Sequence, residues 1–234
     1  MNGPRVRICH VGDDAPLPVA DTYVVVDVIR ASTTAVTAAH QGRGCHPVRS
    51  IEEAHRVAAS LPTALLAGEL HGTLPEGFDL QNSPAALDGR VDVNRPLVLL
   101  STSGAPLMRR AAEEAPTLIV SLRNLEPTAD VLRAVDRVAI LAASPDGLRI
   151  EDAICAARLA RSLGGEPDEV TARIVETCAP LPLEKIRAGK SAAYLRRSDQ
   201  VADLEFVLQH VGDVDAAFAV VGGRVAALAT ETRA

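Results

Sequence analysis

The sequence predicts an α/β fold with a mixed, largely parallel central sheet. Over residues 1–150, short apolar runs alternate with amphipathic segments, which is typical of strands followed by helices. After residue 150 the pattern is mainly helical, and two apolar runs then flank Gly222-Gly223, which indicates a β-hairpin. We therefore expect a sheet that is parallel at its centre, with an antiparallel addition. No linker, low-complexity tract or repeat divides the chain, so residues 1–234 are predicted to form one domain.

Each predicted element rests on a local pattern. Ser50 and Glu53 have the spacing of a capping box, and Gly42 follows a helical segment as a C-terminal glycine does. Strands are expected at 6–10, 22–28, 45–48, 64–68, 96–100, 117–121 and 137–142, with the hairpin at 216–221 and 224–228. Helices are expected at 33–41, 51–60, 105–114, 128–134, 150–163, 167–178, 183–188 and 201–210.

The composition argues against nucleic-acid and membrane partners. Aromatic residues make up only 2% of the chain and the net charge is −6, and both features disfavour binding to nucleic acid. No apolar run is long enough for a membrane span or a signal peptide. The 4 cysteines form no CxxC pair, so we expect a cytoplasmic protein with reduced thiols. An anionic substrate would then need local positive charge or a metal.

Polar clusters follow four predicted strands, at the edge where ligands bind in open α/β sheets. In the run TYVVVDVIRASTT (22–34), Asp27 interrupts the pattern of a buried strand. A buried carboxylate is costly unless it is paired, hydrogen-bonded or bound to a metal. The clusters comprise Asp27, Arg30, Ser32 and Thr33; Glu69, Asp79, Asn82 and Ser83; Ser101, Thr102, Ser103 and Gly104; and Asp146, Gly147, Glu151 and Asp152.

Most members of these clusters also have a purely structural explanation. Asp27 and Glu69 are the exceptions, since each ends an apolar run without an obvious local role. Helix capping, a turn, the helix dipole or loop bracing would explain, taken singly, Ser32, Thr33, Ser103, Gly104, Glu151, Asp152, Asp79 and Asn82.

Together, these residue types suit a phosphoryl site. Carboxylates with few histidines favour a hard cation that takes oxygen ligands, and Mg²⁺ is the first expectation. Several carboxylates close together repel one another unless a cation lies among them. Arg30 offers a planar fork for phosphate oxygens, and helix N-termini bind anions. The sequence therefore predicts Mg²⁺ as cofactor and a small anionic phosphate ester as substrate.

Five motifs make the chain similar to a known family. They are DVIRASTT (27–34), PV-x-SIEEA (47–54), AGE (67–69), GFDLQNSP (77–84) and IEDAICA (150–156). With these motifs the chain resembles the 2-phosphosulfolactate phosphatase family, the ComB-like proteins of coenzyme M biosynthesis. The resemblance implies a three-layer α/β/α domain, often oligomeric, for which we expect a homodimer. It also implies Mg²⁺-dependent hydrolysis of 2-phospho-3-sulfolactate to 3-sulfolactate and phosphate.

The chain departs from the family pattern in three places. Ser103 stands where the family usually has asparagine, Gln81 replaces a glycine, and ASPDG (143–147) replaces a glycine-rich stretch. These changes leave two hypotheses open. One is a phosphatase acting on a small anionic monoester, and the other is a non-catalytic binder of a small phosphate or sulfonate ligand.

The predicted site assigns a role to each residue. Asp27, Arg30 and Asp152 are the predicted catalytic residues, with Asp27 either attacking phosphorus or holding Mg²⁺. The predicted metal ligands are Asp27, Glu69 and Asp79. The predicted substrate-binding residues are Ser32, Thr33, Asn82, Ser83, Thr102, Ser103, Gly104 and Asn124, and the sulfonate is expected at Ser103, Asn124 or Arg123.

Overall fold

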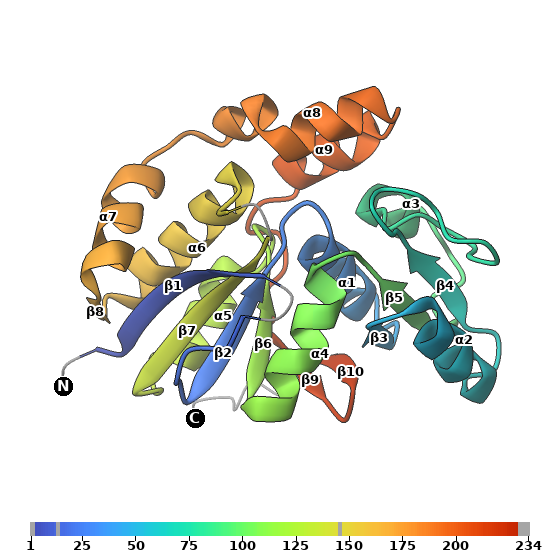
Figure 1. Cartoon of the computed structure of the whole chain (residues 1–234), viewed down its shortest axis with the longest axis horizontal. Coiled ribbons are helices and arrows are strands. Elements are labelled where there is room, and N and C mark those ends of the chain that lie inside the picture. The colour runs from blue at the N-terminus through green and yellow to red at the C-terminus, as the bar shows by residue number, and fades with distance from the viewer. Residues whose placement is uncertain (1–2, 13–14, 145–146, 229–234) are drawn as a thin grey trace.

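The computed structural model describes residues 3–12, 15–144 and 147–228 of the chain. Within these ranges the strands form one sheet in the order β4-β5-β3-β10-β9-β6-β2-β7-β1-β8 (Figure 1). The strands are β1 (Arg5–Val11), β2 (Thr22–Val26), β3 (Cys45–Val48), β4 (Leu65–Gly68), β5 (Leu97–Leu100), β6 (Thr117–Val120), β7 (Arg137–Ala143), β8 (Glu166–Pro167), β9 (Phe218–Val221) and β10 (Arg224–Ala227).

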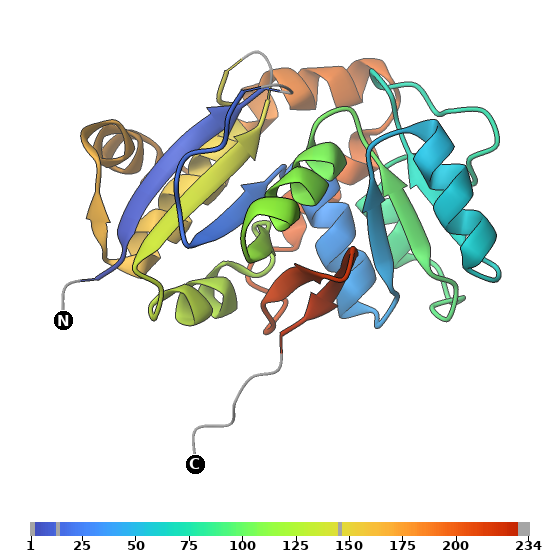
Figure 2. The same ribbon diagram turned by 60° about the horizontal axis from the view of Figure 1, so that its bottom comes forward.

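The sheet consists of two parallel blocks joined by an antiparallel hairpin. Strands β4, β5 and β3 form one block, and β6, β2, β7, β1 and β8 form the other. The β9–β10 hairpin pairs antiparallel with β6 on one side and with β3 on the other, and Figure 2 shows it between the blocks. The predicted hairpin is confirmed, with Gly222 and Gly223 at positive φ as the tight turn requires. Its predicted place was wrong, because the antiparallel element joins the two halves of the sheet.

Helices lie on both faces of this sheet, which confirms the predicted α/β class (Figures 1 and 2). One face of β1, β7, β2 and β6 packs against α5, α6 and α7, and α4 packs against the opposite face. The helices are α1 (Ala31–His40), α2 (Ile51–Ser60), α3 (Pro84–Asp88), α4 (Gly104–Glu114), α5 (Leu125–Leu132), α6 (Ile150–Leu163), α7 (Glu169–Cys178), α8 (Lys190–Arg197) and α9 (Val201–Gln209), with the 3₁₀ helix η1 (Leu183–Ala188).

Strand β2 shows why this chain forms a sheet that is covered on both faces. All of its side chains are buried, and they alternate between two hydrophobic cores. Val24 and Val26 face the core on the α6 side, whereas Tyr23 and Val25 face the core that contains α1 and α4. A strand buried on both faces carries a nearly continuous apolar run, as this one does from Tyr23 to Val26. Its end at Val26 places Asp27 directly beyond the sheet.

The structure corrects several predicted boundaries. Strand β2 ends at Val26, two residues before its predicted end, and α1 begins at Ala31, two residues before its predicted start. Segment 183–188 is a 3₁₀ helix, and α3, α8 and the short β8 have no predicted counterpart. The capping box is confirmed, since the Ser50 hydroxyl accepts from the Glu53 N–H. No helix in the described part of the chain is long and apolar enough to cross a membrane.

The segment from η1 to α9 forms a roof over one edge of the sheet. Figure 1 shows α8 and α9 crossing the top of the molecule, from the side of α6 towards α3. Helix α9 packs on α3 and α8, and η1 packs on α6. The roof therefore connects the two parallel blocks above the sheet edge at which β2 and β7 end.

Candidate active site

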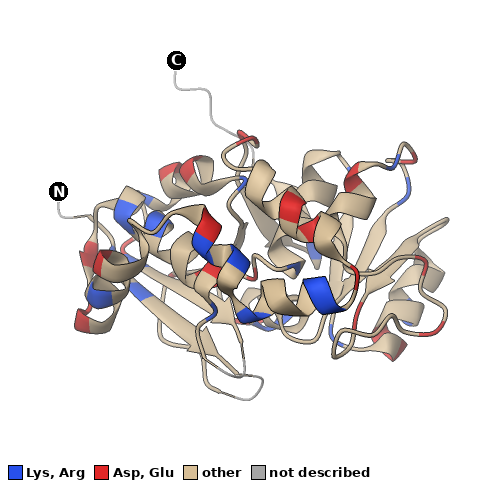
Figure 3. Cartoon of the chain, turned by 90° about the horizontal axis from the view of Figure 1, so that it is seen from above, with Lys and Arg blue, Asp and Glu red and all other residues tan. Residues whose placement is uncertain are grey.

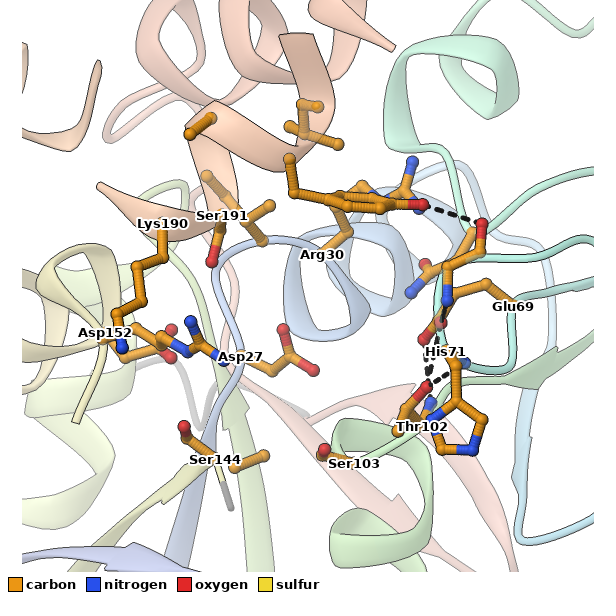
Figure 4. Close-up of a pocket in the computed structure, with 18 of the residues that line it drawn as sticks. Asp27, Arg30, Glu69, His71, Thr102, Ser103, Ser144, Asp152, Lys190 and Ser191 are labelled. Atoms are coloured by element: carbon orange, nitrogen blue, oxygen red, sulfur yellow. Dashed lines mark hydrogen bonds between the residues drawn. The ribbon is translucent and has the colours of Figure 1, made fainter. Parts of the chain in front are cut away.

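A cavity of about 600 Å³ lies beneath this roof. Its walls include residues just beyond four strands: Asp27, Glu69 and Ser144 directly follow β2, β4 and β7, and Thr102 is the second residue after β5. Strands β4 and β5 belong to one parallel block and β2 and β7 to the other, so the carboxyl ends of both blocks contribute to the same cavity (Figure 4).

Asp27 lies at the centre of this cavity and is held by the turn that follows β2. Its backbone N–H donates to the Ser32 hydroxyl at 2.9 Å, and its carbonyl accepts from the Ser32 N–H at 2.8 Å. Burial raises the pKa of its carboxyl to about 7, helped by the charge of Glu69 and opposed by a hydrogen bond from the Ala31 N–H. The side chain is only 9% exposed. Asp27 is therefore a buried acid whose pKa is raised first by burial and then by the charge of Glu69.

Ser32 and Thr33 support this turn but do not line the cavity. Helix α1 begins before them, at Ala31, without a side-chain cap. The Ser32 hydroxyl donates weakly to the Val25 carbonyl at 3.3 Å, and the Thr33 hydroxyl donates to the Val28 carbonyl at 2.8 Å. Both side chains are fully buried. The capping role considered for them is wrong, and the structure gives them a role in shaping the Asp27 turn.

Gly104, at the start of α4, allows Asp27 to occupy its position. A Cβ atom at Gly104 would lie 2.2 Å from Asp27 Oδ2 and 2.7 Å from Ala31 Cβ. Real Cβ atoms do not approach this closely, so any side chain at Gly104 would displace the carboxylate. Gly104 thus contributes to the site by having no side chain, which leaves room for the Asp27 carboxylate.

Gly104→Ala should therefore lower the predicted phosphatase activity by about 10²-fold or more, because small displacements of catalytic groups have effects of this size. The measurement is kcat/KM for phosphate release together with a thermal unfolding curve. Gly89→Ala is the matched control, because a Cβ at Gly89 has its nearest neighbour at 4.0 Å. Equal activity of the two variants would show that the Asp27 position is not critical.

Glu69 is fixed by three donors on the opposite side of the cavity from Asp152 (Figure 4). Its carboxylate accepts from the Thr102 N–H at 2.8 Å, the Thr102 hydroxyl at 2.9 Å and the Gly72 N–H at 2.7 Å. The Thr102 hydroxyl also accepts from the His71 N–H at 2.8 Å. Hydrogen bonds of this kind orient a carboxylate as a metal ligand requires.

Asp152 lies in the first turn of α6 and faces the cavity from the β7 side. It accepts from the Val28 N–H at 2.8 Å. Burial raises its pKa well above the ordinary value, and the charges of Glu151 and Asp27 raise it further. Burial also raises the pKa of Glu151, which receives a hydrogen bond from Ser191. Burial and the neighbouring carboxylates therefore favour the protonated form of Asp152, which lies on the left side of the cavity in Figure 4.

Arg30 is buried at the cavity edge and is paired with the roof. Its Nη1 donates to Asp203 Oδ2 of α9 at 2.7 Å and to Gln200 Oε1. Asp203 Oδ1 in turn accepts from the Ser83 hydroxyl at 2.6 Å and from the Ala85 N–H at 3.2 Å. Arg30 thus lines the cavity from a position set by α9 and the start of α3.

The structure brings only some of the predicted site residues together. Asp27, Arg30, Glu69, Asn82, Thr102, Ser103 and Asp152 line the cavity, and Gly104 contacts Asp27. Ser83 caps α3 and bonds Asp203, and Asp79 is exposed and accepts from the Leu66 N–H at 2.9 Å. Neither is on the cavity wall, so the bracing role considered for Asp79 is the one observed.

Two further predicted residues lie elsewhere. Asn124 is fully buried and bonds the Ser121 N–H and the Ile119 carbonyl, inside the turn before α5. Arg123 pairs with Asp213 at 2.8 Å. Neither lines the cavity, so neither is placed to bind a sulfonate there, and that expectation was wrong. Asp146 lies outside the described residues.

Several cavity residues had no place in the predicted site. Half of them belong to α8, which the apolar pattern does not reveal. The Tyr194 hydroxyl donates to the Gly72 carbonyl at 2.7 Å, which connects α8 to the loop after β4. The one available sequence signal was the 3–4-residue spacing of large polar side chains in KSAAYLRR. The unpredicted lining residues are His71, Gly72, Ser144, Arg149, Lys190, Ser191, Tyr194 and Arg197.

The cavity fits Mg²⁺ bound through few protein ligands. Among the described residues, no group of three or more His, Cys, Asp or Glu side chains could hold a metal alone. Mg²⁺ is usually held by one or two carboxylates together with water and phosphate oxygens. Asp27 and Glu69 meet this requirement, since both line the cavity and the charge of one raises the pKa of the other. Asp79 is not available as a third ligand, because it lies outside the cavity.

Comparisons with known proteins identify the family to which the chain is similar. A family model described as 2-phosphosulpholactate phosphatase matches residues 10–214. A Deinococcus radiodurans protein named probable 2-phosphosulfolactate phosphatase is 34% identical over 200 residues, covering 81% of this chain and 83% of that protein. Proteins with the same name from Thermus thermophilus and Symbiobacterium thermophilum are each 36% identical. The first covers 88% of this chain and 90% of its own length, and the second covers 66% of each.

Proposed function

The chain belongs to the 2-phosphosulpholactate phosphatase family, and from this premise we propose that it hydrolyses 2-phospho-3-sulfolactate to 3-sulfolactate and phosphate with Mg²⁺ as cofactor. The observation that carries the proposal is the meeting of Asp27, Glu69 and Asp152 in one cavity with four cationic side chains, in a chain of net charge −6. The homodimer, the cytoplasmic location and the link to coenzyme M biosynthesis stay predictions.

Asp27 and Glu69 would hold the cation on one side of the phosphate. When bound, Mg²⁺ would neutralise the negative charge that develops on the phosphoryl oxygens. The Arg30 guanidinium would face other oxygens of the same group, since charge-assisted hydrogen bonds to phosphate suit its planar fork. Its ion pair with Asp203 fixes the guanidinium before the substrate arrives. This preorganisation supports stabilisation of the transition state.

We assign the attack on phosphorus to Asp27 and the proton transfer to Asp152. A bond forms between a carboxylate oxygen of Asp27 and phosphorus while the bond from phosphorus to the ester oxygen breaks. The leaving oxygen takes a proton from Asp152, whose pKa is raised well above its ordinary value by burial and by the charges of Glu151 and Asp27. Water then attacks phosphorus and gives a proton back to Asp152, which releases phosphate and restores the Asp27 carboxylate.

The direct test is phosphate release from 2-phosphosulfolactate by the purified protein, with Mg²⁺ and with EDTA. We expect turnover with Mg²⁺, loss of turnover in EDTA, and recovery when excess Mg²⁺ is added. A folded protein that releases no phosphate but is stabilised by the ester would be a binder instead, since native-state binding alone raises the unfolding temperature. Full turnover in EDTA would contradict the assigned cofactor.

A further inference from the structure

One stripe of α8 faces the cavity and carries a cation at each end. Lys190, Ala193, Tyr194 and Arg197 all line the cavity, and their spacing of three, four and seven residues places them on one helix face. Seven residues of helix span roughly 10 Å. Small Ala193 lies between the ends, where it leaves room for a ligand.

The two cations on this stripe have no partners among the described residues, and no carboxylate there lies within ion-pair distance of either. Arg30, by contrast, pairs with Asp203 in the same region. Lys190 is also unusual in this chain, which has only two lysines, Lys185 and Lys190, among its 24 basic residues. In Figure 4 its side chain reaches from α8 down towards Asp152.

Helix α8 is held in place at two points. Near its start, Ser191 hydrogen-bonds the buried Glu151 carboxyl, and Gly189 packs so closely that a Cβ there would lie 3.2 Å from Glu151 Oε2. In its middle, the Tyr194 hydroxyl bonds the Gly72 carbonyl at 2.7 Å. The cations on this face are therefore carried by a fixed helix, which lowers the entropy lost when a ligand binds.

The wall opposite α8 offers a free hydroxyl. Ser144, directly after β7, is 1% exposed and lines the cavity, and its Oγ has no hydrogen-bond partner among the described residues. A buried hydroxyl without a partner is unfavourable, and a ligand oxygen would satisfy it. Figure 4 shows Ser144 below Asp27, across the cavity from Lys190 and Ser191.

The positive charge of Lys190 and Arg197 is confined to the cavity face of α8 and does not belong to a larger basic region. Seen from the roof side in Figure 3, basic and acidic residues are interspersed and form no broad patch of one sign. Inside the cavity, however, the carboxylates of Asp27 and Glu69 would repel any acidic group of the substrate other than the phosphate. Such a group needs cations away from the phosphate position, and the α8 stripe supplies them.

We propose that Lys190 and Arg197 of α8 bind the acidic groups of the substrate that are not hydrolysed, with Ser144 donating from the opposite wall. These residues would then select phosphate monoesters that carry a sulfonate or carboxylate beside the phosphate. The proposal rests on the proposed function, because it assigns specificity residues to the same cavity. A sulfonate is ionised at all working pH values, so this selection does not depend on its protonation.

The first experiment compares kcat/KM for 2-phosphosulfolactate with kcat/KM for p-nitrophenyl phosphate, which carries no second acidic group. The ratio of the two should fall by about 10- to 100-fold in Lys190→Ala and further in Lys190→Ala/Arg197→Ala, as expected for lost hydrogen bonds to charged groups. Lys185→Ala and Arg196→Ala are the matched controls, since both side chains are exposed and outside the cavity. An unchanged ratio in the double variant would overturn the proposal.

The second experiment separates this proposal from the proposed function. Calorimetric titration with 3-sulfolactate, which has no phosphate, should show binding to the wild type and at least tenfold weaker binding to Lys190→Ala/Arg197→Ala. Lactate, which lacks the sulfonate, should bind the wild type more weakly than 3-sulfolactate does. If the wild type hydrolysed no ester, the proposed function would fail while the titration still decided the role of α8. Equal binding of 3-sulfolactate to wild type and double variant would overturn that role.

Discussion

Asp27→Asn should reduce phosphate release by about 10³-fold or more while the protein remains folded, because it removes the group that attacks phosphorus. The amide is close in size to the carboxyl, so it fits the space that Gly104 leaves open. The measurement is kcat for phosphate release at saturating Mg²⁺. Borohydride treatment of the wild type during turnover should also trap an acyl-phosphate at Asp27.

The same substitution should stabilise the metal-free protein at high pH. Below pH 4 the Asp27 carboxyl is protonated in both folded and unfolded chains. As the pH rises from about 4 to about 7, the unfolded chain loses this proton first, since burial and Glu69 raise the folded pKa to about 7. Folding stability therefore falls over this window, by on the order of 4 kcal/mol for a pKa that folding raises from about 4 to about 7, and stays lowered above it.

Denaturant unfolding in EDTA at pH 4 and pH 8 measures this effect. Asp27→Asn should be more stable than the wild type at pH 8 and similar to it at pH 4. Asp79→Asn is the matched control, because Asp79 is an exposed carboxylate outside the cavity. We expect it to keep both activity and wild-type pH dependence. Full activity of Asp27→Asn, or loss of activity in Asp79→Asn, would contradict the site geometry.

The site residues that could be predicted from the sequence are charged residues that end or interrupt an apolar run. Asp27 and Glu69 end apolar runs, and no role visible in the neighbouring sequence explains a carboxylate there, so the sequence predicts a functional role for both. Parallel strands deliver such residues to the sheet edge, and the cavity lies at that edge. A carboxylate that is costly to bury, and that no neighbouring residue in the sequence can pair, is therefore a sign of a functional site that the sequence shows by itself.

The wrong assignments share a different cause. Ser32 and Thr33 looked like capping residues, but α1 begins two residues earlier than predicted, which turns their hydroxyls towards the backbone of the preceding turn. Asn124 follows β6 and resembles a cluster residue, yet it braces its own turn. Short polar side chains fit a local hydrogen bond as well as a ligand, so a shift of one or two residues decides between these roles.

The roof could not be predicted because its role depends on long-range packing. In α8 only Ala192 and Leu195 are buried, so the segment has no apolar stripe to reveal a helix. Its cavity face is polar, and it faces Asp27 only because η1 and α9 dock on α6 and α3. Gly222-Gly223 likewise reveals a hairpin but not the strands between which it inserts. When two paired strands lie far apart in the sequence, the residues of either strand do not indicate which strand it pairs with.

Asp203→Ala should destabilise the protein by about 3–5 kcal/mol, a large share of the roughly 5–15 kcal/mol by which domains are stable. Asp203 and Arg30 are 3% and 4% exposed and lie 2.7 Å apart. Removing the carboxylate leaves a buried guanidinium without its partner, and also frees the Ser83 hydroxyl and the Ala85 N–H. Chemical denaturation measures the loss.

Glu205→Ala is the matched control for this loss. Glu205 lies two residues along α9 and pairs with Arg187, but that pair is solvent-exposed, so its removal should change stability far less. Equal unfolding midpoints for Asp203→Ala and Glu205→Ala would show that the buried pair contributes nothing specific. Both variants remove an acid–arginine pair from the same helix, but the Asp203 pair is buried and Asp203 also accepts from Ser83 and Ala85.

A double variant separates the structural role of this pair from its chemical role. Replacing a buried ion pair by apolar residues of similar size is often neutral or stabilising, so Arg30→Met/Asp203→Leu should recover much of the stability lost in Asp203→Ala. It should nevertheless remain inactive, because Arg30 lines the cavity where phosphate would bind. A stable double variant with wild-type activity would show that Arg30 serves only to attach α9. A stable but inactive one would show that the roof retains a buried charge because catalysis needs it.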